Sequence, residues 1–178
     1  MKELSLHILD IAQNSIVAGA STIEIDIDEN SLTSTLSIRI RDNGRGIQSD
    51  ILDRITDPYT TSRTTRKVGM GLPLLNDACR ISGGKLSVSS AQGEGTNVVA
   101  TLGLNHIDRQ PLGDVSGVLL LLVSANPAIE FIYQHSKNGN KYIFNTKEVK
   151  EVLDGLPINS PDVMRMLREM IDENLEEL

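Results

Sequence analysis

The chain has 178 residues, 39% hydrophobic and 23% charged, which is the composition of a globular protein with a sizeable core. Its formal net charge of −7 argues against binding to nucleic acid or to an anionic membrane. The single cysteine, Cys79, excludes an internal disulfide. No signal peptide is recognised at MKELSLHILD, and the longest apolar run, VLLLLV, is far shorter than the ~20 residues of a membrane span. We therefore expect a cytoplasmic protein.

The first predicted helix carries polar residues on one face. Residues 5–20, SLHILDIAQNSIVAGA, have apolar residues at helical spacing, and His7, Asp10 and Asn14 follow at intervals of three and four. Polar side chains that face a core cost a few kcal/mol unless each finds a partner. That partner is protein, water or a ligand, and the helix alone does not decide between them.

Beyond this helix, alternating apolar and polar residues predict strands. The strands pair as two antiparallel hairpins, 22–28 with 36–42 and 85–90 with 96–104. In the first hairpin, acids and arginines lie on the exposed face, where they can pair across the strands. Residues 48–68 are polar and without periodicity, so we expect a long irregular segment there. GMGLPLLNDACRIS then predicts a helix with Pro73 in its first turn.

A domain boundary is expected at 105–113, where NHIDRQPLG interrupts the pattern. Residues 1–105 form the first domain, and 106–178 form a small α+β appendage that packs on it or binds a partner. The appendage is expected to contain a helix from about 114, strands at 129–135 and 141–145, and helices from about 146 and 160. The last helix has a methionine-rich apolar stripe that suits core packing or, alternatively, a partner or dimer surface.

Three glycine-containing turns are the candidates for ligand binding. DNGRGI places Asp42 at the end of a strand before two glycines, GMG precedes a helix whose first amides could bind an anion, and GEGT lies between two strands. Each turn is a weak signal alone. The Walker and Rossmann patterns are absent.

Taken in order, D-x-x-x-N, D-x-G-x-G, PYTTSR, G-x-G-L and G-x-G-T resemble the ATP-binding domain shared by DNA gyrase, heat-shock protein 90, histidine kinases and MutL, the GHKL superfamily. The resemblance covers about residues 1–105, and PYTTSR with GMGLPL is most similar to the histidine kinase and anti-sigma kinase branch. It implies the Bergerat fold, an α+β two-layer sandwich with a mixed, mostly antiparallel sheet and helices on one face. It also implies ATP and Mg²⁺ as cofactors.

The resemblance also implies roles for individual residues. Asn14 is expected to contact the metal, and Asp10, one helical turn earlier, to be the base wherever ATP is hydrolysed. Asp42 is expected to accept a hydrogen bond from the adenine amino group, with Thr96 supporting the same base edge. The other nucleotide-binding residues implied are Gly44, Gly46 and Ile47 near the base and sugar, Tyr59, Thr60, Arg63 and Lys67 in a lid, and Gly69, Met70, Gly71 and Leu72 at the phosphates.

The departures from the family pattern bear on activity. Hydrolysing members carry a glutamate where this chain has Asp10, which is shorter by one methylene, so we expect slow hydrolysis at best. Val17 stands where kinase relatives often have a basic residue, and Pro73 replaces the second glycine of GTGLGL. The family's phosphoacceptor lies on a separate dimerisation helix. His7 is therefore expected to be a pocket-edge or capped histidine.

Three functions remain open at this point. The first is a kinase-like signalling protein that phosphorylates or controls an unidentified partner protein. The second is a slow ATPase that acts as a conformational clamp, and the third is a sensor that binds ATP or ADP without turnover. A homodimer is also open.

Overall fold

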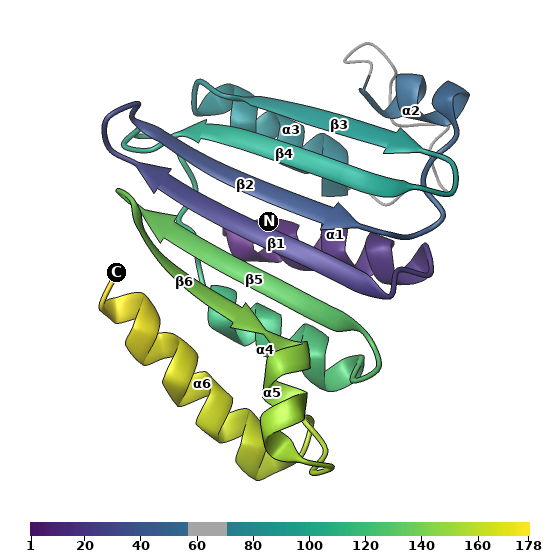
Figure 1. Ribbon diagram of the computed structural model, residues 1–178. Coiled ribbons are helices and arrows are strands. Elements are labelled where there is room, and N and C mark those ends of the chain that lie inside the picture. Colours follow the sequence, from purple (N-terminus) through teal and green to yellow (C-terminus); the bar gives the residue numbers. More distant parts are fainter. Residues whose placement is uncertain (57–70) are drawn as a thin grey trace.

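The computed structural model describes residues 1–56 and 71–178, and these residues form a six-stranded sheet with helices mainly on one face (Figure 1). The strand order is β3-β4-β2-β1-β5-β6. Neighbouring strands are antiparallel, except for β1 and β5, which are parallel. The strands are β1 (Thr22–Asn30), β2 (Thr35–Asp42), β3 (Lys85–Ala91), β4 (Gly95–Gly103), β5 (Glu130–Lys137) and β6 (Asn140–Asn145).

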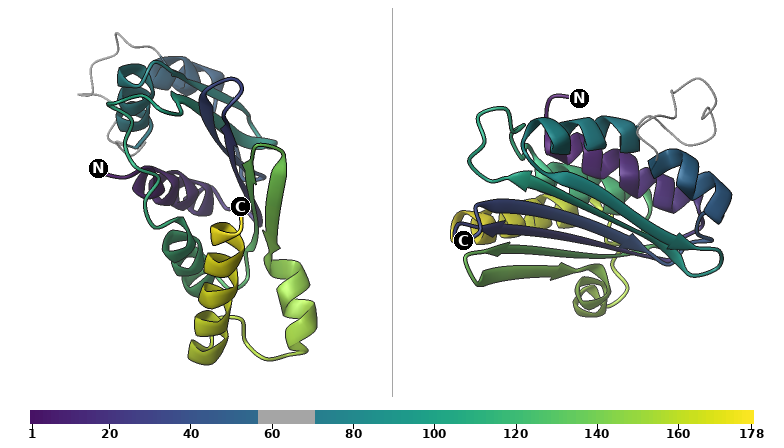
Figure 2. Two further views of the ribbon diagram at one scale, coloured as in Figure 1. Left: turned by 90° about the vertical axis from the view of Figure 1, so that its left-hand side faces the viewer. Right: turned by 90° about the horizontal axis from the view of Figure 1, so that it is seen from above.

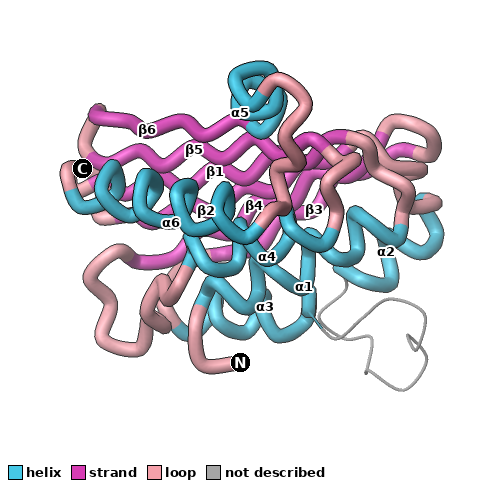
Figure 3. Tube along the Cα trace, turned by 90° about the horizontal axis from the view of Figure 1, so that it is seen from below, coloured by secondary structure: helices cyan, strands magenta, loops and turns pink. Residues whose placement is uncertain are grey.

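The described helices lie on both sides of this sheet, but unequally. α1, α3, α4 and α6 run along one face, whereas α5 lies on the opposite side near the end of β6 (Figures 2 and 3). The resulting α+β architecture is a mixed, mostly antiparallel sheet under a layer of helices, as the sequence predicted. The helices are α1 (Leu4–Val17), α2 (Ser49–Thr56), α3 (Gly71–Ile81), α4 (Val115–Ala125), α5 (Thr146–Leu153) and α6 (Pro161–Glu176).

The core lies between the sheet and this helical layer, because alternate strand residues point toward the helices. In β1 these are Ile23, Ile25 and Ile27, each at most 1% exposed. Both predicted hairpins are confirmed. On the open face of the first hairpin, Asp26 is in register with Arg39 and their charged groups are 3.8 Å apart, as the alternation of charges predicted.

Helix α2 corrects the expectation of an irregular segment over residues 48–68. Residues 49–56 are helical, so the prediction is wrong for this part. Leu52 and Ile55, three positions apart, are partly buried, and Ile55 packs against the core. Asp50 in the first turn and Arg54 in the last complement the helix dipole. Residues 48–68 are polar as a whole, so the apolar Leu52 and Ile55 at helical spacing within them were overlooked.

The C-terminal residues continue the same sheet. β5 pairs with β1, and β6 pairs with β5, so the strands expected at 129–135 and 141–145 are confirmed. Phe131 and Tyr133 of β5 are fully buried and belong to the same hydrophobic cluster as the core of the first hundred residues. In the described part of the chain, no helix combines the length and apolar character needed to cross a membrane.

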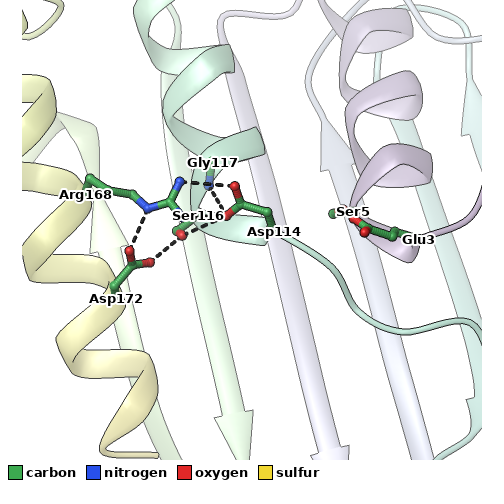
Figure 4. Close-up of polar contacts among 7 residues, drawn as sticks. All are labelled: Glu3, Ser5, Asp114, Ser116, Gly117, Arg168 and Asp172. Carbon is green, nitrogen blue, oxygen red and sulfur yellow. Dashed lines mark hydrogen bonds and ion pairs between the residues drawn. The ribbon is translucent and has the colours of Figure 1, made fainter.

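A cluster of polar contacts holds α6 against α4 (Figure 4). Asp114, the N-cap of α4, accepts a hydrogen bond from the Gly117 amide and pairs with Arg168 of α6 at 2.9 Å. Arg168 also donates to Asp172 at 2.6 Å, and the Ser116 hydroxyl donates to the same carboxylate. These contacts hold the C-terminal half of α6 beside the start of α4.

Candidate functional site

A pocket of about 150 Å³ lies between α1, the loop that follows β2, the start of α3, and β4. Its walls are mainly apolar, with an amide, a carboxylate, two hydroxyls and an arginine among them. The lining residues are Ile11, Asn14, Ser15, Val17, Ala18, Asp42, Arg45, Gly46, Ile47, Leu72, Thr96 and Val98. The fold thus brings together segments from the first, second, fourth and fifth motifs of the sequence.

Asp42 is the buried carboxylate of this pocket, and its side chain is held on both oxygens. It is 7% exposed and ends strand β2. The Ser15 hydroxyl of α1 donates to Oδ2 at 2.6 Å, and the backbone amide of Gly44 donates to Oδ1 at 2.8 Å. A buried carboxylate needs such donors. Asp42 is therefore fixed in orientation while it keeps acceptor capacity for a ligand.

Thr96 lies directly beside Asp42 across the pairing of β2 and β4. Its hydroxyl is 3.0 Å from that of Ser90, which is opposite Thr96 in the pairing of β3 and β4. Ser90 also accepts from the Ile47 amide and donates to the Gly95 carbonyl, both at 2.8 Å. Ser90, Thr96 and Asp42 therefore form one row across three strands.

The loop after β2 is shaped by glycine. Gly46 has φ +72°, a conformation that side chains rarely adopt. A Cβ on Gly46 would also overlap the Ala91 carbonyl oxygen, because the loop lies directly on the β3–β4 hairpin. The amide of Gly93 donates to the Arg45 carbonyl at 2.7 Å across the same contact. These contacts hold Gly46 and Ile47 at the edge of the pocket.

Asp10 and Asn14 lie one helical turn apart on α1, and both are half-buried. Asn14 lines the pocket. Asp10 lies at the start of α3, where its carboxylate takes the space that a side chain on the buried Gly71 would need. Leu72, the next residue of α3, lines the pocket. The two polar residues of α1 thus extend from the pocket to the N-terminus of α3.

The predicted residues Tyr59, Thr60, Arg63, Lys67, Gly69 and Met70 lie outside the described residues. Among the described ones, Gly44 supports Asp42 through its amide. His7 is 2% exposed, and its Nε2 is 3.0 Å from the Gln110 side-chain oxygen. Burial lowers the pKa of His7, although the contact with Gln110 opposes this shift. The ring is thus a buried group that contacts the Gln110 side chain and does not line the pocket described above.

Sequence reasoning missed Ser15 and Ser90. Ser15 directly follows Asn14, and a serine at a buried helix position was a usable signal because its hydroxyl must find a partner. Ser90 carried no such signal, since alternating serines in β3 are typical of a partly exposed strand. Its role depends on strand pairing and on the loop after β2, which the local sequence does not specify.

The oxygen atoms that α1 offers as metal ligands are compatible with Mg²⁺, which prefers oxygen ligands and usually keeps several waters. Asn14 offers an amide oxygen at the pocket, and Asp10 offers a carboxylate one turn away. Within residues 1–56 and 71–178 there is no group of three or more His, Cys, Asp or Glu side chains placed to hold a metal ion. Asn14, with Asp10 one helical turn before it, is the position we consider for the ion because both offer oxygen ligands.

The first part of the chain matches a known protein family. A family model described as the histidine kinase-, DNA gyrase B- and HSP90-like ATPase matches residues 2–106. The sensor protein kinase WalK of Staphylococcus haemolyticus (strain JCSC1435) is 32% identical over 95 residues, which are 51% of this chain and 16% of that kinase. The non-motile and phage-resistance protein of Caulobacter vibrioides is 29% identical over 112 residues, 58% of this chain and 13% of that protein. The chain thus spans less than a fifth of the length of either relative.

Two solved structures share the fold. The N-terminal domain of a DNA repair protein has a TM-score of 0.53 at 22% identity, covering 80% of this chain and 52% of that one. The MutL ATPase domain of Aquifex aeolicus, complexed with ADP, has a TM-score of 0.51 at 16% identity, covering 86% of this chain and 70% of that one. Both coverages exceed the share of the chain matched by the family model. The likeness in fold therefore extends into the C-terminal residues.

Proposed function

Because the chain belongs to the histidine kinase-, DNA gyrase B- and HSP90-like ATPase family, we propose that it is a Mg²⁺- and ATP-binding regulatory protein of the histidine kinase-like type. In this proposal it phosphorylates or controls a partner protein. The observation that carries the proposal is the buried Asp42 carboxylate, oriented by Ser15 and Gly44 at the pocket between α1 and β4.

Asp42 gives the pocket its preference for adenine. A carboxylate accepts hydrogen bonds, and the exocyclic amino group of adenine donates them. Guanine has a carbonyl oxygen at that position, so it would leave a buried acceptor facing another acceptor. Mismatches of this kind can discriminate by about 10⁴-fold. The apolar residues Ile11, Leu72 and Val98 would contact the faces of the base.

The phosphates would lie toward the start of α3. The first amides of a helix bind anions, and α3 begins at Gly71 and Leu72 beside Asp10. Asn14 would hold Mg²⁺ through its amide oxygen. When bound, the ion would neutralise charge on the phosphates during phosphoryl transfer. The chain's own residues would bind and orient ATP, and the acceptor group would come from the partner protein.

Asp10 separates the three candidate activities. As a base it would orient and deprotonate a water molecule, which gives slow hydrolysis. Its carboxylate lies against the first residue of α3. Transfer to a partner needs Asp10 only for the position of α3 and the phosphates, and a sensor needs it only for affinity. We place the kinase-like activity first and the ATP/ADP sensor second.

The C-terminal residues would choose the partner. They continue the sheet through β5 and cover the core with α4 and α6, and they lie beyond the segment matched by the family model. On α6, Met166 is 53% exposed and Met170 is 37% exposed. Methionine side chains adapt to different partner surfaces. This surface is the first to probe by cross-linking once a partner is known.

The experiment uses γ-labelled ATP with Mg²⁺ and measures free phosphate and protein-bound label, alone and with candidate partner proteins. Asp10→Asn is compared with wild type, and Asp28→Asn on the exposed open face is the matched control. Label on a partner supports the kinase. Free phosphate that Asp10→Asn abolishes and Asp28→Asn does not would favour the ATPase. ATP binding without either product would favour the sensor, and a failure to bind ATP would refute the proposal.

A further inference from the structure

We infer that Ser90 is a positioning residue that sets the hydrogen-bonding direction of the Thr96 hydroxyl and thereby selects a 6-amino purine over a 6-oxo purine. The inference rests on the proposed function, because it concerns recognition of the ATP base. Ser90 does not line the pocket itself. It acts through Thr96, which does.

The number of hydrogens on each group fixes the direction of these hydrogen bonds. A serine hydroxyl has one hydrogen to donate and two lone pairs to accept with. The Gly95 carbonyl can only accept, so the 2.8 Å contact uses the hydrogen of Ser90. The Ile47 amide can only donate, so its 2.8 Å contact uses one lone pair. In the 3.0 Å contact between Ser90 and Thr96, the donor must then be Thr96.

With its hydrogen directed at Ser90, Thr96 can offer only lone pairs to a ligand. Its neighbour in the row, Asp42, is also an acceptor, and the Ser15 hydrogen is directed at Asp42 over 2.6 Å rather than at the more distant Ile11 carbonyl, 3.3 Å away. This end of the pocket therefore presents adjacent acceptors from two strands. An amino group with two N–H donors complements both of them, whereas a 6-oxo group meets lone pairs on either side.

The test compares the dissociation constants for ATP and for inosine triphosphate, which has a 6-oxo group in place of the amino group, by isothermal titration calorimetry. Ser90→Ala frees the Thr96 hydrogen to turn toward the ligand. The preference for ATP over inosine triphosphate should fall about 3- to 10-fold, the worth of one hydrogen bond. Ser90→Thr keeps the hydroxyl and should keep the preference. Ser89→Ala, exposed on the opposite face of β3, is the matched control.

A second variant separates this role from a structural one. Thr96→Val removes the hydroxyl without altering Ser90. It should weaken the binding of ATP about 3- to 10-fold and should not weaken the binding of inosine triphosphate. In the Thr96→Val background, Ser90→Ala should change the preference no further. Because Thr96→Val is measured on its own, it keeps the inference testable if Ser90→Ala does not fold.

Three outcomes would overturn the inference. If Ser90→Ala weakened the binding of ATP and of inosine triphosphate equally, the role of Ser90 would be structural only. A fall in the preference that persists in the Thr96→Val background would show that Ser90 does not act through Thr96. Loss of affinity for inosine triphosphate in Thr96→Val would show that Thr96 donates to the base. If wild type binds no ATP, the proposed function fails as well, so the two failures are distinguishable.

Discussion

The carboxylate of Asp10 occupies the space that a side chain on Gly71 would require. A Cβ on Gly71 would overlap Asp10 Oδ2 and lie 2.9 Å from Cγ. The first residue of α3 therefore approaches α1 closely enough to contact a short acidic side chain. This relationship links two sequence motifs more than fifty residues apart, and it gives a structural reason for glycine at position 71.

Gly71→Ala should displace the Asp10 carboxylate and the first turn of α3. We expect Mg²⁺·ATP binding to weaken about tenfold, as measured by calorimetry. In an Asp10→Ala background the overlapping atoms are gone and the nearest remaining atom, the Cβ at position 10, lies 3.3 Å away. Gly71→Ala should therefore have a much smaller effect there. Equal effects in both backgrounds would show that the contact with Asp10 does not matter.

Ser15→Ala should destabilise the fold through Asp42. Removal of the hydroxyl leaves a carboxylate oxygen in a 7%-exposed residue without its 2.6 Å donor. The free energy of unfolding should fall by about 1–3 kcal/mol in urea titrations. Ser87→Ala, on an exposed position of β3, should change it little. If the two substitutions had the same effect, water would be replacing the Ser15 hydroxyl at no cost.

His7 should make the fold sensitive to mild acid. Burial lowers the pKa of its imidazole. Because the folded state then binds fewer protons than the unfolded state, stability falls as the pH drops from about 6.5 toward the lowered value. His7→Gln should flatten the slope of unfolding free energy against pH in this range, and His106→Gln, at an exposed position, is the matched control. An unchanged slope in His7→Gln would contradict the assignment.

Arg168 should couple α6 to the start of α4 (Figure 4). Partial burial acts to raise the pKa of Asp114, but hydrogen bonds from the Gly117 amide and from Arg168 outweigh it and lower that pKa. The resulting stability is present above an ordinary pKa near 4 and is lost as pH falls through the lowered value.

Arg168→Gln should therefore reduce the free energy of unfolding by about 1 kcal/mol at neutral pH, since the pair is partly exposed. It should also make the free energy of unfolding fall less steeply as the pH drops below about 4. Arg165→Gln, which breaks the exposed pair with Asp162, is the matched control and should have little effect. Equal effects at positions 165 and 168 would show that the contacts of Arg168 contribute no more than a surface pair.

Local patterns were enough to predict the strands and most helices. Residues such as Ile23 and Ile25 alternate because one face of the sheet is covered, and that pattern is visible in the sequence. The parallel pairing of β1 with β5 joins residues about a hundred positions apart, and no local signal specifies it. Helix α2 was missed because residues 48–68 are polar as a whole, which hid the helical spacing of Leu52 and Ile55.

The candidate site was only partly predictable for the same reason. Asn14 and Asp42 belong to motifs, and the fold places both of them in one pocket. Ser15 and Ser90 contribute through hydrogen bonds made across α1, β2, β3 and β4. Such contacts arise from tertiary neighbours, so residue type and spacing alone could not reveal them.

The most direct test of the central claim is a calorimetric titration with ATP, with and without Mg²⁺, on wild type and Asp42→Asn, with GTP as the comparison nucleotide. Thermal unfolding would confirm that the variant is folded. We predict that wild type binds ATP more tightly with Mg²⁺, that GTP binds far more weakly, and that Asp42→Asn loses at least tenfold in ATP affinity. No ATP binding, equal binding of GTP, or an unaffected Asp42→Asn variant would contradict the proposed nucleotide site.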